Sequence, residues 1–245
     1  MSEDVASWLA CWVNQYGHFP DDYLVIDTET TGLDRQDDVI VQLGYCRVEN
    51  REVVENVAYV LDWTDHTLNQ DWLCGRLEST GQRLREKGHT YSWTLEKLAS
   101  EGKPPIDVLF DLLGRLREYG GKMLAAHNGV GFDVPMIEAH LKRFLALPFT
   151  FPKQLWDTGV MEKAIQLDVR PRPGEPLLVF CKRVLGIRAA GVKWSLDRHC
   201  TPKYQLDHKY GLDTSRSHTA DYDAYVTSCL LEEFRQLAQA HQETP

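Results

Sequence analysis

The sequence has few of the features that mark a specialised class of protein. No apolar run is long enough to cross a bilayer, and Glu3 and Asp4 lie where a secretory signal would carry positive charge. None of the six cysteines forms a Cys-x-x-Cys pair, and the adjacent His199 and Cys200 fit no usual zinc pattern. A disulfide framework is also unexpected in a chain of 245 residues. These absences favour a cytoplasmic protein that does not associate with membranes.

Positive charge is also scarce. The chain has 27 lysines and arginines against 36 acidic residues, a net charge of −9, which argues against a protein that coats nucleic acid by electrostatics alone. An enzyme acting on nucleic acid is still allowed, because bound cations can neutralise an acidic site. Residues 170–198 are the exception, with seven basic residues against two acidic ones. Two interpretations of this stretch stay open, a flank that faces phosphates and a solvated helix face.

The pattern of apolar residues predicts a single α/β domain over residues 1–245, built on a mixed sheet. Strands are predicted at 23–27, 39–48, 53–61, 123–126 and 150–156. The first three are joined by short connections, which implies an antiparallel meander. Helices are predicted at 1–16 (within an N-terminal segment 1–20), 106–119, 132–144 and 219–240. Residues 62–105 are interpreted as a helical excursion from this domain.

Two carboxylates lie at the end of the first predicted strand. Asp27 and Glu29 are two positions apart, so both project from one face of the strand while Thr28 points the other way. Holding two like charges together is costly unless a cation lies between them. Gly32, in the turn that follows, permits a tight backbone close to a ligand. The pair indicates a cation site, and the alternative is two surface acids at a strand end.

Two further clusters place carboxylates near predicted helix starts. The segment 127–133 connects a strand to a helix, which would bring Asp133 to the carboxyl edge of the sheet. The alternative role for Asp133 is to cap that helix. In segment 218–224, Asp223 lies one turn into the long C-terminal helix, and His218 lies in the loop before it.

In this order the clusters resemble the three motifs of the DEDDh exonucleases, the family of polymerase proofreading subunits and ribonuclease T. Residues 25–33, Val-Ile-Asp-Thr-Glu-Thr-Thr-Gly-Leu, resemble the first motif, and His127-Asn128 with Phe132-Asp133 resemble the second. His218-x-Ala-x-x-Asp-Ala224 is similar to the third motif in its histidine form, since position 219 holds Thr where the tyrosine form has Tyr.

The resemblance extends over residues 23–237. The chain departs from the family pattern at 129–131, where Gly-Val-Gly lengthens the second motif, and at 62–102, which is longer than in compact members. Neither departure touches a catalytic position. The resemblance implies a ribonuclease H-like α/β fold, a mixed five-stranded sheet flanked by helices, and the activity of a 3′–5′ exonuclease.

The resemblance also implies a two-metal mechanism. Two Mg²⁺ ions, for which Mn²⁺ substitutes, would be held by Asp27, Glu29, Asp133 and Asp223. Asp27 would bridge both ions, Glu29 and Asp223 would complete one site, and Asp133 would hold the other partly through water. His218 would take the proton from the attacking water.

Further family positions imply contacts with the substrate. The residues concerned are Thr30, Thr31, Gly32, Leu33, Asn128 and Phe132. Leu33 would wedge against the terminal base, and its alternative is a turn residue tucked into the core. Asp221 is out of register with the third motif and is interpreted as a first-turn acid that the helix dipole favours. Asp157 resembles a family position that is not a metal ligand.

The implied substrate is the 3′ end of a single nucleic-acid strand, from which mononucleotides are removed. The Asp-Thr-Glu-Thr-Thr-Gly form of the first motif resembles proofreading subunits more than oligoribonucleases, which favours DNA. An exoribonuclease that trims RNA 3′ ends is the alternative, because no residue unambiguously reads the 2′-hydroxyl. A non-catalytic module that binds nucleic acid or a polymerase is less favoured, because all four acids and the histidine are present. A polymerase or another replication or repair protein is the partner class implied.

Overall fold

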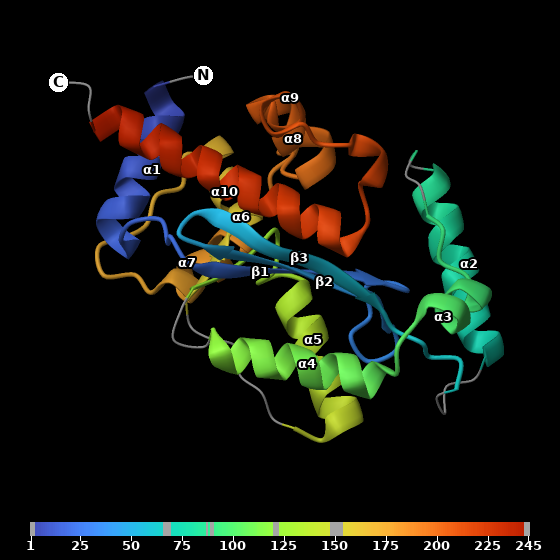
Figure 1. The fold of residues 1–245 in the computed structure, drawn as a ribbon. Coiled ribbons are helices and arrows are strands. Elements are labelled where there is room, and N and C mark those ends of the chain that lie inside the picture. Colours follow the sequence, from blue (N-terminus) through green and yellow to red (C-terminus); the bar gives the residue numbers. More distant parts are fainter. Residues whose placement is uncertain are drawn as a thin grey trace.

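The computed structural model describes residues 3–65, 70–86, 88, 91–119, 123–147 and 154–242. A five-stranded sheet of order β3-β2-β1-β4-β5 lies at its centre (Figure 1). The strands are β1 (Tyr23–Thr30), β2 (Ile40–Glu49), β3 (Glu52–Val60), β4 (Met123–Ala126) and β5 (Leu155–Asp157). The first three form an antiparallel meander, while β4 runs parallel to β1 and β5 parallel to β4. The predicted mixed sheet with its meander is confirmed.

Helices cover both faces of this sheet. They are α1 (Glu3–Tyr16), α2 (Gln70–Glu86), α3 (Leu95–Glu101), α4 (Pro105–Glu118), α5 (Asp133–Leu145), α6 (Thr158–Gln166), α7 (Leu177–Gly186), α8 (Thr201–Tyr204), α9 (Leu206–Tyr210) and α10 (Ala220–Gln242). In Figure 1, α1 and α10 lie on one side of the sheet and α4 and α5 on the other. Among the described residues, no helix is both long and apolar enough to span a membrane.

The alternation of side chains along β1 explains the two layers. Val25 packs into the core formed with α1, α7 and α10, whereas Leu24 and Ile26 pack into the core formed with α4 and α5. A strand buried on both faces reads as a continuous apolar run, which is what Leu24-Val-Ile26 provides. The helix α2, from the predicted excursion 62–105, packs against the α4–α5 core through Leu73 and Leu77.

Two strand boundaries differ from those predicted. β1 continues three residues beyond the predicted 23–27, because Thr28, Glu29 and Thr30 also pair with β2. Asp27 and Glu29 therefore lie within a paired strand rather than at its end. The predicted fifth strand, 150–156, lies partly outside the described residues, and the described strand ends at Asp157.

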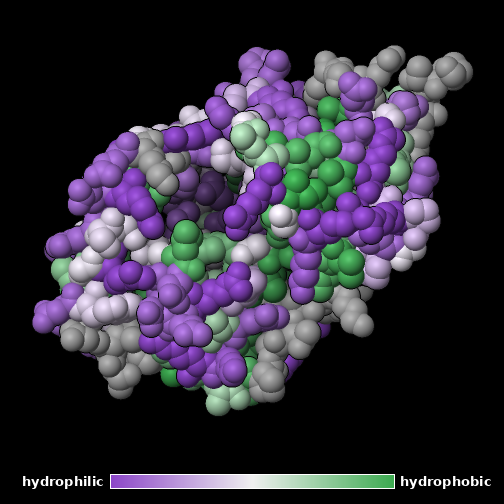
Figure 2. Space-filling model, turned by 180° about the vertical axis from the view of Figure 1, so that it is seen from behind, coloured by the Kyte–Doolittle hydropathy of each residue, from purple (hydrophilic) through white to green (hydrophobic). Residues whose placement is uncertain are grey.

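Figure 2 shows the opposite side of the molecule from Figure 1. Hydrophilic residues cover most of this side and surround a recess in the surface, while hydrophobic residues gather in a separate area.

Candidate active site

The two carboxylates of β1 are half-buried on one face of the strand. Burial is the largest cause that raises the pKa of Asp27 and of Glu29 well above the usual range, and the charges of Asp133 and Asp223 raise both further. Each carboxylate is therefore within electrostatic reach of acids from two distant parts of the chain. The fold brings these four like charges together, and their mutual repulsion is unfavourable without a compensating cation.

Asp133 is hydrogen-bonded directly to Thr28 of β1. Its Oδ1 accepts hydrogen bonds from the backbone N–H of Thr28 at 2.9 Å and from the Thr28 hydroxyl at 2.7 Å. Burial raises the pKa of Asp133 to about 7. The cap position of α5 belongs to Phe132, which makes no side-chain cap. The structure thus links the Asp133 carboxylate to the strand that carries Asp27 and Glu29.

Asp223 and His218 come from the start of α10. His218 has a left-handed backbone, with φ of 69°, and its N–H donates to Asp223 Oδ2 at 3.2 Å. Burial raises the pKa of Asp223 to about 7. One ligand atom each from Glu29, His218 and Asp223 lies within 4.8 Å of the other two. Asp221 instead pairs with Arg216.

Two residues of β2, which the sequence analysis did not single out, seat α10 against β1. Gly44 pairs with Asp27 across the sheet, and a Cβ on Gly44 would lie 2.3 Å from the backbone of Ala220. Beside it, Gln42 accepts a hydrogen bond from the Ala220 N–H at 2.8 Å. A lone glycine inside a strand pattern is a signal for such a close backbone approach. Gly44 thus allows α10 to bring Asp223 to the carboxylates of β1.

Asp27, His218 and Asp223 line a cleft of about 740 Å³, whereas Glu29 and Asp133 are not among its lining residues. Of the residues predicted from the sequence, it is lined by Asp27, Asn128, Phe132, His218 and Asp223. The segment 192–199 also lines the cleft. Most of it belongs to the basic stretch 170–198, for which the sequence left open a flank that faces phosphates, but no residue of it was assigned to the site.

His127 holds this wall in place. Its Nε2 lies 2.6 Å from the Trp194 carbonyl oxygen, and its Nδ1 lies 3.0 Å from the Thr158 hydroxyl. A carbonyl can only accept, so Nε2 carries the proton. Burial lowers the pKa of His127 to about 4, and the ring is therefore neutral at neutral pH. It is a structural histidine, unlike His218.

Asp157 anchors the loop of the second motif. Its buried carboxylate accepts from the N–H groups of Asn128 at 2.8 Å, Val130 at 2.9 Å and, at the start of α6, Val160 at 3.0 Å. Its oxygens are engaged by backbone amides. The contacts agree with the interpretation of Asp157 as a residue that is not a metal ligand.

The predicted substrate residues divide between two places. Asn128 and Phe132 lie in the cleft, whereas Thr31, Gly32 and Leu33 line a separate groove beside α2. Leu33 is 70% exposed, so it is not tucked into the core. Thr30 is buried, and its hydroxyl donates to the Gly32 carbonyl oxygen at 2.6 Å.

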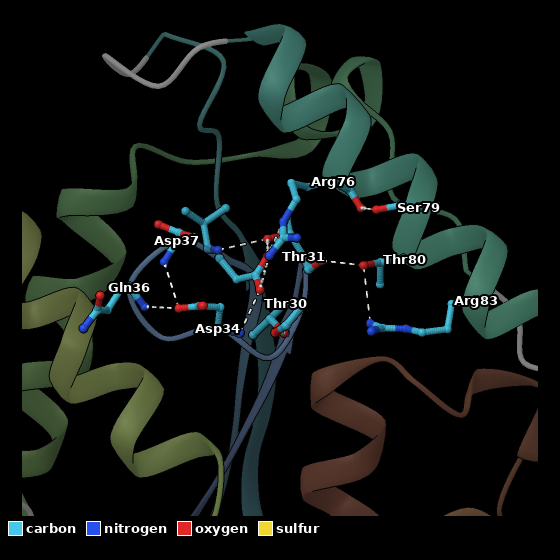
Figure 3. A network of polar contacts seen from close by, with 12 residues as sticks. Thr30, Thr31, Asp34, Gln36, Asp37, Arg76, Ser79, Thr80 and Arg83 are labelled. Atoms are coloured by element: carbon cyan, nitrogen blue, oxygen red, sulfur yellow. Dashed lines mark hydrogen bonds and ion pairs between the residues drawn. The ribbon is translucent and has the colours of Figure 1, made fainter.

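The reason for a glycine at position 32 is close packing against the protein itself. A Cβ on Gly32 would lie 2.4 Å from a carboxylate oxygen of Asp38. Asp38 is buried and accepts a hydrogen bond from the Thr31 hydroxyl at 2.9 Å. Figure 3 shows Thr31 within the polar network of this loop. Gly32 is therefore needed to make room for Asp38, a reason that the sequence did not indicate.

The basic stretch 170–198 divides in a similar way. Lys193 and Arg198 line the cleft. By contrast, Arg183 pairs with Glu175 at 2.7 Å and Arg170 with Asp168 at 3.2 Å. Part of the stretch faces the site, and part is ion-paired surface.

No protein-family model matches the chain. Among curated proteins, it is 26% identical over 153 residues to the PolC-type DNA polymerase III of Clostridium perfringens, covering 62% of this chain and 9% of that protein. The Thermotoga maritima PolC-type polymerase is 27% identical over 207 residues, covering 84% of this chain and 11% of that protein. The chain therefore spans about a tenth of the length of these relatives.

Among solved structures, E. coli exonuclease I in complex with a dA16 oligonucleotide has a TM-score of 0.54 and 18% identity, covering 90% of this chain and 42% of that one. The zinc-bound complex of E. coli exonuclease I with single-stranded DNA has a TM-score of 0.52 and 19% identity, with 90% and 42% covered. These likenesses confirm the ribonuclease H-like exonuclease fold. With the polymerase relatives, they also confirm the resemblance to the DEDDh exonucleases.

Proposed function

We propose that the protein is a metal-dependent 3′–5′ exonuclease that removes mononucleotides from single-stranded DNA. The observation that carries this proposal is the convergence of Asp27 and Glu29 with Asp133, Asp223 and His218, from three separate parts of the chain. The PolC-type relatives are DNA polymerases, and the exonuclease I structures hold single-stranded DNA, which supports DNA as the substrate.

The donor set fits divalent cations. Carboxylate oxygens are the hard ligands that Mg²⁺ and Mn²⁺ take, and a few suffice because Mg²⁺ keeps several waters. Burial and mutual repulsion raise the pKa values of Asp27 and Glu29, and cations between the carboxylates would reverse that effect. Asp27, Glu29, Asp133 and Asp223 would hold two ions. When bound, such ions activate a water and offset charge on the phosphate.

Proton transfer and the orientation of the acids would depend on the side chains around the metal site. His218 lies beside Glu29 and Asp223, where it would take the proton of the attacking water. Asp197 Oδ2 lies 3.5 Å from His218 Nε2 and favours the protonated ring that forms. Thr28 fixes the Asp133 carboxylate through two hydrogen bonds, so this acid is oriented before substrate arrives.

One experiment tests both the direction in which the strand is digested and the dependence of hydrolysis on metal. With a 5′-labelled single DNA strand and Mg²⁺, we expect products that shorten one nucleotide at a time from the 3′ end, with release of 5′-mononucleotides. EDTA should stop the reaction, and an RNA strand of the same sequence should be digested more slowly. Cleavage of a circular single strand at the linear rate would show an endonuclease, and undiminished hydrolysis in EDTA would exclude the two-metal mechanism.

The role of Gly44 can be tested with a single methyl group. In Gly44→Ala the new Cβ meets the backbone of Ala220, so α10 must shift and carry Asp223 away from β1. Overpacking of this kind costs about 1–3 kcal/mol. We expect a lower melting temperature and at least a tenfold loss of turnover, on the order of the penalty for a misplaced catalytic group.

Gly75→Ala on α2 is the matched control, because nothing lies within 4 Å of its Cβ position. It should leave turnover unchanged and should not lower the melting temperature. Wild-type melting temperature and turnover in Gly44→Ala would show that α10 is not seated through this contact.

A further inference from the structure

A second groove, of about 460 Å³, lies between the loop that follows β1 and the helix α2. One wall is formed by residues 31–34, immediately after the strand that carries Asp27 and Glu29. The other wall is formed by Arg76, Ser79, Thr80 and Arg83 of α2. In Figure 3 the side chains of Arg76, Thr80 and Arg83 extend from α2 toward the loop.

The two walls are held together by polar contacts. Arg76 pairs with the buried carboxylate of Asp38 at 2.6 Å, and the Thr80 hydroxyl donates to the Thr31 carbonyl oxygen. Asp38 in turn holds Thr31 and the backbone of Asp34, to which it is bonded at 2.8 Å. The groove is therefore a fixed part of the fold.

Arg83 carries a positive charge that this network does not pair. Its guanidinium lies 3.5 Å from the Thr80 hydroxyl, and among the described residues no carboxylate pairs with it. The acid on the opposite wall, Asp34, accepts from the backbone N–H groups of Gln36 and Asp37 and is engaged by its own turn. An exposed guanidinium in a groove is suited to a phosphate group.

The groove is adjacent to the acidic cluster, because Thr31 of its wall follows Glu29 by two positions along the chain. Burial raises the pKa of Tyr91, the charge of Glu29 raises it further, and the charge of Arg83 lowers it, so Tyr91 lies within electrostatic reach of both. Its ring faces Gly81, on the same helix as Arg83. The 70%-exposed side chain of Leu33 is on the rim, where an apolar surface is available to a base.

We propose that this groove binds the phosphodiester backbone of the strand upstream of its 3′ end, with Arg83 contacting a phosphate. The inference rests on the proposed exonuclease function. A strand whose terminal phosphodiester is at the Asp27–Asp223 cluster passes Leu33 and reaches α2 with its next phosphates. The helix α2 thereby supplies a strand-binding surface beside the catalytic cleft.

The test compares Arg83→Gln with wild type on two substrates, an oligothymidine strand and a thymidine dinucleotide. The dinucleotide has a single phosphodiester, which must lie at the acidic cluster to be hydrolysed, so it has no phosphate left to reach the groove. On the long strand we expect KM to rise by about three- to tenfold with kcat unchanged. The slope of log KM against log salt should fall by roughly 0.7, the value for one phosphate contact on a single strand. On the dinucleotide, the variant should match wild type.

Arg117→Gln is the matched control, since Arg117 is an exposed arginine of α4, outside the groove. It should change neither KM nor the salt slope, and Arg83→Glu should raise KM on the long strand more than Arg83→Gln does. If KM is unchanged in Arg83→Gln, or rises equally on the dinucleotide, the groove does not bind the strand. Neither result would contradict the proposed exonuclease function. Failure of wild type to digest either substrate would instead overturn the proposed function itself.

Discussion

Asp27→Asn is expected to reduce hydrolysis to the background level while making the metal-free protein more stable. The substitution keeps the shape of the side chain but removes one of the four clustered charges. A ligand that would bridge both ions is lost, so the remaining acids cannot hold the pair in place.

The gain in stability follows from the direction of the pKa shift. Burial, then the charges of Asp133 and Asp223, raise the pKa of Asp27 in the folded protein. An acid with a raised folded-state pKa favours folding at low pH, and this contribution is lost as the pH rises through the raised value. At neutral pH, the ionised Asp27 is therefore a cost to the metal-free fold, and asparagine removes it.

Melting temperatures in EDTA and in Mg²⁺ measure both effects. In EDTA, Asp27→Asn should melt above wild type, whereas Mg²⁺ should raise the melting temperature of wild type more than that of the variant. Asp221→Asn is the control, because Asp221 pairs with Arg216 and should affect neither hydrolysis nor the Mg²⁺ response. An active Asp27→Asn, or an inactive Asp221→Asn, would show that the acids have been assigned wrongly.

The fold could be predicted from the sequence because the local sequence signals agree with the tertiary packing. Leu24-Val-Ile26 predicts a strand covered on both faces, and the structure places that strand at the centre of the sheet. The short break between the next two strands predicts the meander that is observed. The end of β1 was missed, because Asp27 and Glu29 are poor strand residues taken alone. Their pairing with Gly44 and Gln42 on β2 outweighs that preference.

The candidate site was predictable where motif residues themselves carry the chemistry. Asp27, Phe132 and Asp223, one from each of the three motifs, line one cleft. The supporting contacts were not predictable, because they join residues far apart in the chain. Trp194 is held by His127, and α2 is held by Asp38, and neither pairing follows a local spacing rule. The groove beside Arg83 is hidden from the sequence for the same reason.

His218→Ala should lower turnover by about 10²–10⁴-fold, the range for removal of a general base. Unlike Asp27→Asn, it removes no carboxylate, so the Mg²⁺-dependent rise in melting temperature should persist. His208→Ala provides a matched control, since His208 is exposed on α9 and does not line the cleft. Its turnover should equal that of wild type.

The pH dependence identifies the base. The hydrogen bond to Asp197 is the largest cause that raises the pKa of His218, with the charge of Asp223 adding to it and burial opposing it. A base must be neutral to accept a proton, so turnover should rise with pH until the pH passes this raised value. Asp197→Asn removes the main cause and should move the rising limb to lower pH, and His218→Ala should flatten it.

The position of His218 beside Glu29 and Asp223 makes the melting measurement decisive, because a ring nitrogen at that distance could also ligate a cation. A base leaves the Mg²⁺ response intact when it is removed, whereas a ligand does not. If His218→Ala abolishes the rise in melting temperature along with turnover, His218 is a metal ligand and the proton must go to another group. If the response persists and the rising limb disappears, His218 is the base, and Asp197 sets the pH at which it acts.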